Sequence, residues 1–552
     1  MKKQLLCVLT AVILLLVPAL SFAQAPSLGT AANFVLFSSA GPVTSTNSVD
    51  LPKLTGNVGT NGSTVTSGFG NIDGQIHDND GVTIGGSGQA ATDLLAARDE
   101  IITLGNGTVI SHVVGLGNGE ILTKGVYTIS AAATLGGVLT LNSTATTDVF
   151  IFIIDGSLSV DGTADVTFTG GTTACNVFWQ TNGVVSIVAG AKMKGTIIAK
   201  SGAINMTGVT LEGRALAVTG TVSLDGSTAR IPIGCASPNL SPTLTGPTYP
   251  TLASTECYVL FTTTGAMTNS NAAGLFTGDI GSNSVAPVGF IPANVTGTIH
   301  SPGASTLATA NELGTLYTYL NTLTTDITLL YPQQLGNDLV LTPHTYNMTA
   351  AALLTGNLYL NAQGNADAVF VIKVSGALTT AAGAAIILQN QAQSKNVFWK
   401  VTGAVGAAAG SSFRGTIVNT GDIGLSTTVA LDGRGLTTAG AVSTAGSPAI
   451  MSTMPTGCSS TGIASYNNGN TETVTIAPNP FSTSTTIMIN DASQINNCIF
   501  KMYNVLGEEV MNANITKQIT TLETSNLPSG IYFYKIIGNN KTIQSGKLVS
   551  QQ

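Results

Sequence analysis

Short β-type runs separated by glycines dominate residues 27–458. Runs such as GTIIAK, RALAV and TVSL are rich in β-branched residues and are too short and broken for helices. Glycines recur at a fixed interval, since Gly190, Gly208 and Gly226 are 18 residues apart. At about 3.3 Å per strand residue, this interval fits a three-sided coil with roughly six residues per side. The pattern predicts a β-solenoid, in which each coil pairs in parallel with its neighbours. A β-sandwich with coincidental spacing is the alternative.

Two segments break the β pattern and predict helices, at 90–102 and 307–323. The second has a single apolar stripe at helical spacing, formed by Leu313, Leu316, Tyr317, Leu320 and Leu323. A helix with one apolar stripe needs a surface to cover. We therefore expect each helix to lie along one side of the coil stack.

The chain contains an internal duplication. NVFWQTNGVVSIVAG from Asn176 recurs as NVFWKVTGAVGAAAG from Asn396, 220 residues later, and Arg214 matches Arg434 at the same offset. Two stretches rich in Pro, Ser, Thr or Asn read as linkers. The sequence therefore predicts a leader at 1–23, a first domain at 24–236, a linker at 237–252, a second domain at 253–458, a linker at 459–473 and a final domain at 474–552.

Composition narrows the possible functions. Only 9% of residues are charged, the net charge is −7, and 43% are hydrophobic. The scarcity of Lys and Arg argues against nucleic-acid binding and against a polybasic membrane surface. Four histidines leave little room for His-based catalysis or metal binding. We expect no cofactor and no metal.

The N-terminus predicts export. Lys2 and Lys3 precede an apolar run at 5–20, and Ser-Phe-Ala before Gln24 is a cleavage motif, so 1–23 reads as a signal peptide. No second run of 18 apolar residues follows, and we expect no stable membrane span. Export permits disulfides, although sequence alone does not fix their pairing. The placement of the cysteines around the repeats suggests Cys257–Cys458 and Cys175–Cys235, which leaves Cys498 over.

Ordered motifs in both copies carry a family resemblance. LGTAANFVLFSSAGPVTST, TGNVGT, CNVFWQ and GTIIA in the first copy, with TGDIGS, NVFWK and LDGRGL in the second, resemble the microbial ice-binding protein family. The resemblance implies a mainly β protein of two tandem right-handed three-faced β-solenoids, each with one long helix alongside and coils stacked out of sequence order. It also implies a secreted, monomeric protein that binds ice crystals through a flat face and inhibits their growth or recrystallisation.

In that family the ice face bears tetrads of the type T-A/G-x-T/N. Thr207-Gly208-Val209-Thr210 fits this tetrad fully, whereas no tetrad of the second copy does. Thr is stiff at χ1 and pairs a methyl with a hydroxyl, and stacked coils repeat about every 4.8 Å, comparable to oxygen repeats on ice planes. The resemblance assigns ice contacts to Thr163, Thr207, Thr210, Ser227 and Thr228 in the first copy and to Ser411, Ser412, Thr427 and Thr428 in the second.

The last domain has a different pattern. APNPFSTSTTIMI, FKMYNVLGEEV and LPSGIYFYKI resemble the C-terminal sorting domain of the type IX secretion system. Alternation places Tyr532, Tyr534 and Ile536 on one side of a strand and Ile531 and Phe533 on the other, which predicts a small antiparallel sandwich. The resemblance implies export by that machinery and a final location outside the cell, either released or attached to the surface.

An enzyme is the first rival hypothesis. A solenoid polysaccharide lyase or hydrolase needs paired carboxylates or a Ca²⁺ cluster on one face. Asp148, Asp155, Asp161 and Asp165 lie close in sequence, but Ala368, Ser375, Ala381 and Ala385 replace them in the second copy. We therefore predict that the protein is not an enzyme.

The second rival is a cell-surface adhesin that binds glycan or another cell through the same solenoids. It would share the fold and the sorting domain.

Among the repeated residues, His77 and His300 are expected to make structural hydrogen bonds rather than to bind metal. Trp179 and Trp399 are expected in the core.

Overall fold

The computed structural model describes residues 24–46, 53–62, 66–81, 86–236, 238–239, 243–451, 455, 458, 474–489, 498–538 and 541–551. The predicted signal peptide and the linker predicted at 459–473 lie outside these residues. The chain forms two compact units, Met1–Cys458 and Ser459–Gln552. The first unit contains both copies of the repeat, here called copy 1 (24–236) and copy 2 (253–458).

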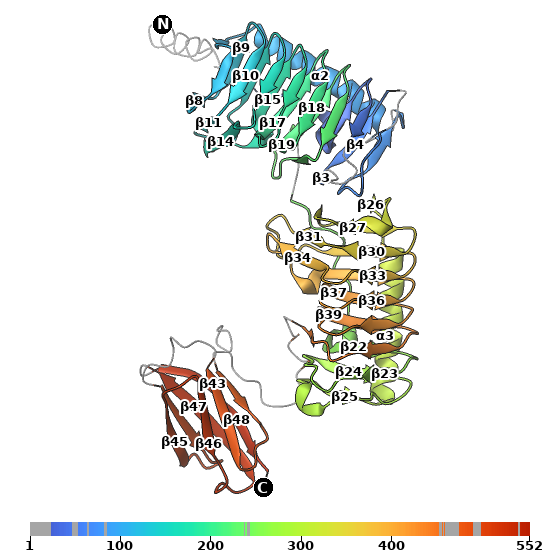
Figure 1. Ribbon diagram of the computed structural model, residues 1–552, viewed down its shortest axis with the longest axis vertical. Helices are drawn as coiled ribbons and strands as arrows, with labels where there is room; N and C mark the ends of the chain where they lie inside the picture. Colours follow the sequence, from blue (N-terminus) through green and yellow to red (C-terminus); the bar gives the residue numbers. More distant parts are fainter. Residues whose placement is uncertain are drawn as a thin grey trace, which may run out of the picture. The chain divides into compact units, whose positions relative to one another are not determined.

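Copy 1 is a stack of coils with three strand positions per turn (Figure 1). One turn runs through β12 (Phe150–Ile154), β13 (Leu158–Val160) and β14 (Asp165–Gly170), and the next begins at β15 (Val177–Thr181). The first strand position forms the sheet β5 (Ile76–Asp78), β4 (Asn57–Thr60), β1 (Phe34–Ser38), β19 (Thr210–Ala217), β17 (Lys192–Ala199), β15, β12, β9 (Gly125–Ile129) and β6 (Ile110–Ser111). The second forms a seven-stranded sheet of β2 (Val43–Ser45), β20 (Val222–Asp225), β18 (Ile204–Thr207), β16 (Val185–Ile187), β13, β10 (Ala133–Gly136) and β7 (Gly115–Gly117). The third contains β8 (Glu120–Thr123), β11 (Val138–Ser143), β14, the first residues of β17 and β19, β21 (Thr228–Arg230) and β3 (Lys53–Thr55).

Copy 2 repeats this architecture. Its first sheet runs β25 (Ile299–His300), β24 (Asp279–Ser282), β22 (Tyr258–Thr262), β39 (Ala430–Thr437), β37 (Ser412–Asn419), β35 (Val397–Val401), β32 (Phe370–Val374), β29 (Thr345–Met348) and β26 (Ile327–Thr328). Its seven-stranded sheet runs β23 (Met267–Asn269), β40 (Val442–Thr444), β38 (Ile423–Leu425), β36 (Val405–Ala407), β33 (Leu378–Thr380), β30 (Ala352–Thr355) and β27 (Leu335–Gly336). The third position contains β28 (Leu339–Leu341), β31 (Asn357–Asn361), β34 (Ala385–Gln389) and β41 (Ala449–Ile450). The mainly β fold class with two tandem solenoids is confirmed.

The coils are not stacked in sequence order. Strand β1 pairs with β19 on one edge, where Leu36 lies opposite Ala215, and with β4 on the other. The first coil of the chain is therefore inserted beside the last one. This arrangement confirms the discontinuous stacking that the resemblance implied, and copy 2 repeats it with β22 between β39 and β24.

Each copy has one long helix along its first sheet, α2 (Ser87–Gly105) and α3 (Ala304–Thr322) (Figure 1). In α3, the predicted stripe residues Leu313, Leu316 and Leu320 are buried and pack in one cluster with Phe398 and Leu436 of the sheet. The one-sided apolar stripe thus meets the outward apolar side chains of the first sheet, as expected.

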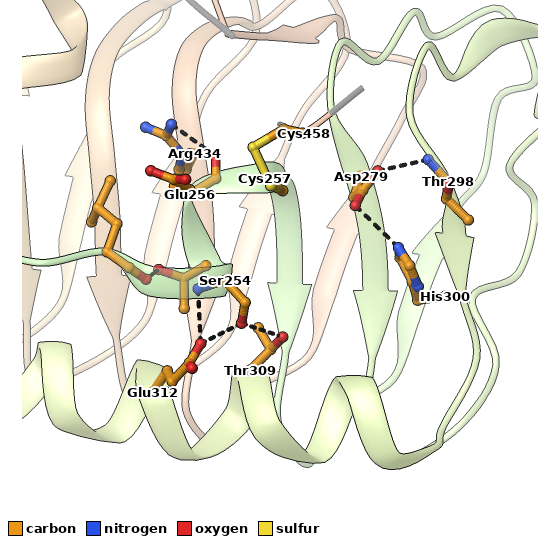
Figure 2. Close-up of a disulfide and its surroundings, with 12 residues drawn as sticks. Ser254, Glu256, Cys257, Asp279, Thr298, His300, Thr309, Glu312, Arg434 and Cys458 are labelled. Atoms are coloured by element: carbon orange, nitrogen blue, oxygen red, sulfur yellow. Dashed lines mark hydrogen bonds and ion pairs between the residues drawn. A yellow bond between two sulfur atoms is a disulfide. The ribbon is translucent and has the colours of Figure 1, made fainter. Parts of the chain in front are cut away.

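A buried arginine in each copy ties the entry of the chain to the coils. In copy 1, Arg214 Nε donates to the carbonyl of Ala32 at 2.7 Å, and burial lowers the pKa of Arg214 to about 10. In copy 2, Arg434 donates to the carbonyl of Glu256 at 2.9 and 3.0 Å (Figure 2). The matched arginines of the repeat therefore hold equivalent turns.

The same turn of copy 2 is fixed by a helix side chain and by a disulfide. Glu312 of α3 accepts the backbone N–H of Ser254, and Cys257 is bonded to Cys458 (Figure 2). Copy 1 has the bond Cys175–Cys235. The suggested pairing is confirmed, and Cys498 is a buried thiol in the second unit. Trp179 and Trp399 are fully buried, as expected; Trp179 stacks on Phe152 with ring centroids 4.1 Å apart.

Glycines stack on one another at one corner of each solenoid. Gly421, Gly440 and Gly265 occupy this corner in adjacent coils of copy 2. A Cβ on Gly440 would lie 2.0 Å from the backbone of Gly421, and one on Gly265 would lie 2.0 Å from the backbone of Gly440. The close approach of neighbouring backbones leaves no room for a side chain.

The second unit is a small antiparallel β-sandwich. One sheet contains β42 (Val474–Ala477), β43 (Ser484–Ile489) and β46 (Ile519–Glu523), and the other contains β45 (Glu509–Ile515), β44 (Cys498–Tyr503), β47 (Gly530–Gly538) and β48 (Lys541–Ser550). Tyr532, Tyr534 and Ile536 face the core while Ile531 and Phe533 are exposed, which confirms the predicted alternation. Within the described part of the chain, no helix is long and apolar enough to cross a membrane.

The glycine corner gives a stability test. Gly440→Ala should destabilise copy 2 by about 3 kcal/mol because the new methyl must displace backbone rather than a flexible side chain. This loss should lower its melting temperature by roughly 10 °C. Gly314→Ala is the control, because a Cβ there meets no atom within 4 Å and alanine favours the helix. Differential scanning calorimetry checks both, and equal melting temperatures would contradict the close-approach argument.

Candidate functional site

Each solenoid has three sides, and in the first unit the helix covers the side formed by the first sheet. The other two sides are open to solvent. The side formed by the seven-stranded sheet is here called the seven-strand face, and the side formed by the third strand position is called the third face. On either face, a repeated surface can act as a site only through equivalent positions in successive coils.

The seven-strand face of copy 1 carries one continuous row of small polar side chains along its middle. The strands pair in parallel without a register shift, so the row members lie directly opposite one another. Neighbouring members are about 4.8 Å apart along the stack. Ser223 donates to Asn205 Oδ1 at 2.8 Å, which fixes both side chains. In stack order the row is Thr134, Ser159, Ser186, Asn205, Ser223 and Thr44.

A second row lies beside the first and carries no charge. The residue before each strand is two positions from the middle row, and strand alternation turns it to the same side. In β10, β13, β16, β18 and β20 these residues are Ala132, Ser157, Val184, Ala203 and Thr221. Among the described residues of this face, charge enters at the opposite edge, where Asp161 and Asp225 flank Val188 and Thr207. The centre of this face is therefore a neutral surface of methyl, hydroxyl and amide groups.

The seven-strand face of copy 2 has glycines at the centre of its middle row. Its middle row is Leu353, Thr379, Gly406, Gly424, Ser443 and Thr268, again without a register shift. The absent side chains of Gly406 and Gly424 leave a shallow trough of about 570 Å³. The neighbouring row is alanine at Ala351, Ala377, Ala404, Ala441 and Ala266, with Asp422 as its one charge. Asp422 accepts the N–H of Ala441 at 2.7 Å and is held at the corner.

The third face of copy 1 is charged. Lys192 and Asp165 form an ion pair at 3.1 Å, and Arg230 and Glu212 form another at 3.2 Å. Lys194 lies over the ring of Phe168. These charged groups make the third face less neutral than the seven-strand face.

The predicted ice contacts fall on several parts of the coil. Thr207 ends β18 on the edge of the seven-strand face, whereas Thr210 begins β19 on the third face, next to Thr228. A corner formed by Gly208 and the buried Val209 separates Thr207 from Thr210. The tetrad therefore spans two sheets instead of lying along one, contrary to the single flat panel that we expected.

The other predicted residues lie at corners or point inward. Ser227 and Ser411 are each 1% exposed and hydrogen-bond to backbone, so neither reaches the surface. The tetrad pattern predicts both serines as ice contacts, and this prediction is wrong because the third position of the tetrad turns into the coil. Thr163 is exposed at a corner, where its hydroxyl donates to Asp161.

In copy 2 the remaining predicted residues occupy the start and end of corner turns. Thr427 and Thr428 are exposed in the turn after β38, and Thr428 has a φ of 61°. Ser412 begins β37 on the third face and is half-buried. None of these three residues lies in the middle row of the seven-strand face.

The tetrad pattern does not include the middle row, although the sequence carries a signal for this row. Five of the seven strands of the face (β10, β13, β16, β18 and β20) contain an apolar, polar, apolar run, as in Leu158-Ser159-Val160 and Val185-Ser186-Ile187. Such alternation marks one buried and one exposed side. Aligning these short runs by the coil repeat places their central residues in one column.

The carboxylates considered for catalysis each have a local partner. Lys124 holds Asp148 at 2.8 Å, and this hydrogen bond lowers the pKa of Asp148 below its usual value. Asp155 accepts from Asn182 at 2.7 Å, and Asp165 pairs with Lys192. They serve corners and edges of the coil instead of converging as a pair.

The repeated histidines make matched contacts. His77 lies 3.3 Å from the Asn57 amide, and His300 lies 3.1 Å from Asp279, at the corresponding position of copy 2 (Figure 2). These are the structural hydrogen bonds that we expected. One cluster among the described residues, Glu256, Cys257 and Cys458, has ligand atoms close enough for an ion, but its sulfurs form the disulfide.

Comparison with known proteins agrees with this architecture. The family model described as ice-binding-like matches residues 38–230 and 261–449, and the model for a secretion system C-terminal sorting domain matches 475–551. The sorting domain marks a secreted or cell-surface protein. The solved structure of an ice-binding protein from an Antarctic Flavobacteriaceae bacterium is 45% identical, with a TM-score of 0.72, and covers 78% of this chain and 99% of its own.

Two ice-binding proteins from other organisms are similar in sequence to parts of the chain. An ice-binding protein of Nostoc sp. (strain HG1) is 34% identical over 184 residues, which is 33% of this chain and 64% of the relative. An ice-binding protein of Flavobacterium frigoris (strain PS1) is 35% identical over 88 residues, or 16% of this chain and 32% of the relative. The matches thus span less than two thirds of these relatives. Because the family model covers more than half of the chain and finds both copies, the protein belongs to the ice-binding-like family.

Proposed function

We propose that the protein adsorbs to ice crystals through the seven-strand face of its solenoids and so inhibits ice growth or recrystallisation. The neutral, regularly repeated middle row of copy 1 is the observation that carries this proposal. The named relatives are ice-binding proteins, which favours this function over the adhesin alternative.

The chemistry of the face suits ordered water. Hydroxyl and amide groups at the strand repeat can hold water at positions comparable to oxygen repeats on ice, while the flanking methyl groups of Ala132 and Ala203 bind water weakly. The backbone ladder fixes these groups before binding, so little conformational entropy is lost on adsorption. A protein that adsorbs in this way forces the crystal to grow as curved fronts between bound molecules, which opposes further growth.

The remaining parts of the chain support action outside the cell. We assign the C-terminal domain to the type IX secretion machinery as its partner, with the solenoids delivered to the exterior. No catalytic step is part of the proposal.

Thermal hysteresis and recrystallisation assays on the mature full-length chain test the function itself. Micromolar protein should shape ice crystals and slow recrystallisation, and the adhesin control assay should show no binding to glycan arrays. A protein that leaves ice unaffected at this concentration, yet binds glycan, would establish the adhesin instead.

Substitutions in the middle rows test the site. Ser186→Tyr with Ser443→Tyr should remove most of the thermal hysteresis, because a ring projecting from each row prevents close contact with a crystal plane. The matched control is Thr169→Tyr, which adds the same ring to the exposed third face of copy 1 and should keep hysteresis. Melting temperatures of both should stay within about 2 °C of the parent, as for surface substitutions. Equal loss in the control would move the site.

Substitutions at two threonines on either side of one corner distinguish the seven-strand face from the third face as the ice-binding surface. Thr207→Tyr should weaken hysteresis, because Thr207 lies on the edge of the seven-strand face, whereas Thr210→Tyr should have a smaller effect. Ice-affinity partitioning of the two variants measures the difference. A larger effect at Thr210 would assign ice binding to the third face.

A further inference from the structure

The two solenoids meet through polar groups that are specific to their facing ends. Asp73 lies in the last coil of copy 1, where it pairs with β3, and its carboxylate reaches copy 2. The hydroxyl of Thr342 donates to Asp73 Oδ2 at 2.8 Å, and the hydroxyl of Tyr346 lies 2.5 Å from Asp73 Oδ1. Both partners come from the first coils of copy 2.

These contacts are buried. Asp73 is 3% exposed, Thr342 is 2% exposed and Tyr346 is fully covered. Burial raises the pKa of Asp73. A buried carboxyl group is costly unless it is hydrogen-bonded, and here its side-chain partners belong to the other copy. The carboxylate at the end of copy 1 and the hydroxyl groups at the start of copy 2 are therefore chemically complementary.

Further contacts surround this centre. Asn71 exchanges two hydrogen bonds with the backbone of Tyr331, at 2.8 and 2.9 Å. Gln75 donates to the carbonyl of Asp326 at 2.6 Å, and Lys53 pairs with Asp338 at 3.3 Å.

The segment predicted as an extended linker is held by both copies. Asn239 exchanges hydrogen bonds with Leu28 and Pro26 of copy 1. Further along, the carbonyl of Thr245 accepts the N–H of Val369 of copy 2, and Tyr319 of α3 donates to the carbonyl of Thr248. The connection is thus docked on each side of residues 240–242.

The joint is directional. At the far end of copy 2 the repeat places Thr296 where copy 1 has Asp73, and Thr296 bonds within its own copy to Gly278. At the first end of copy 1, Tyr127 and Thr123 repeat the contact of Tyr346 with Thr342. The Asp73 carboxylate and its Thr342 and Tyr346 partners are therefore found together where copy 1 meets copy 2. The far end of copy 2 lacks this carboxylate, which favours one internal junction over end-to-end chains of molecules.

We propose that this junction locks the two solenoids into one rigid body with a fixed relation between their seven-strand faces. The consequence for ice rests on the proposed function. Once one face has adsorbed, a rigid second face is already placed, so its effective concentration at the crystal does not depend on a flexible tether.

Spin-label distances in the full mature chain test the rigidity without ice. Labels on p-acetylphenylalanine at Ser201 and Ser375, both exposed, leave the disulfides intact. The parent should give one narrow distance distribution. Asp73→Ala with Asn71→Ala should broaden it, whereas the control pair Asp155→Ala with Asn182→Ala, which removes a hydrogen bond inside copy 1, should not. If circular dichroism shows that the first variant unfolds, Gln75→Ala with Lys53→Ala removes only the surrounding contacts.

The outcomes separate the two proposals. A broad distribution in the parent, or no change in the folded junction variants, overturns the rigid junction. If the parent gives a narrow distance distribution, the junction variant should require a roughly tenfold higher concentration than the parent for the same ice-affinity partitioning. Unchanged partitioning overturns the consequence for ice. If the parent gives a narrow distance distribution but does not partition into ice, ice binding is refuted and the rigid junction is retained.

Discussion

The parallel backbone ladder between coils is the constraint on which the rest of the structure depends. Each coil repeats the one below it at the spacing of a β-sheet, so every position of the coil becomes a column. The columns that turn corners have to be glycine where neighbouring backbones nearly touch, as at Gly421 and Gly440. The columns that face inward are apolar, and one outward column stays free of charge. A single periodicity thus sets the core, the corners and the exposed lattice.

The two copies use this periodicity differently. In copy 1 the middle row is serine, threonine and asparagine, while in copy 2 glycine takes the places of Ser186 and Asn205 and Leu353 that of Thr134. Both solutions keep the surface small and neutral. The entry of each copy is nonetheless preserved, since Arg214 and Arg434 hold equivalent carbonyls. The two copies therefore share a framework, whereas the side chains of their exposed rows differ in size.

Much of the fold could be predicted because its signals are local and repeated. Glycine spacing indicated the coil, the leucine stripe indicated α3, and the cysteines around the repeats indicated both disulfides. The candidate surface was harder to predict. A tetrad read along the chain joins Thr207 to Thr210, but the corner at Gly208 turns them onto different sheets. Burial of Ser227 and Ser411 depends on the direction of each corner, and the contacts of Asp73 depend on a coil far away in sequence.

The strand order also has a consequence for how the protein is made. Strand β1 lies between β4 and β19, so Leu36 has one partner nearby at Val58 but its other partner, Ala215, follows almost 180 residues later. The earliest part of copy 1 therefore cannot complete its sheet until nearly the whole copy has been synthesised. Such long-range pairing slows folding, because a large loop must close before the contacts are gained. The amino-terminal coil of copy 1 is therefore the part whose burial waits longest for the remainder of the copy.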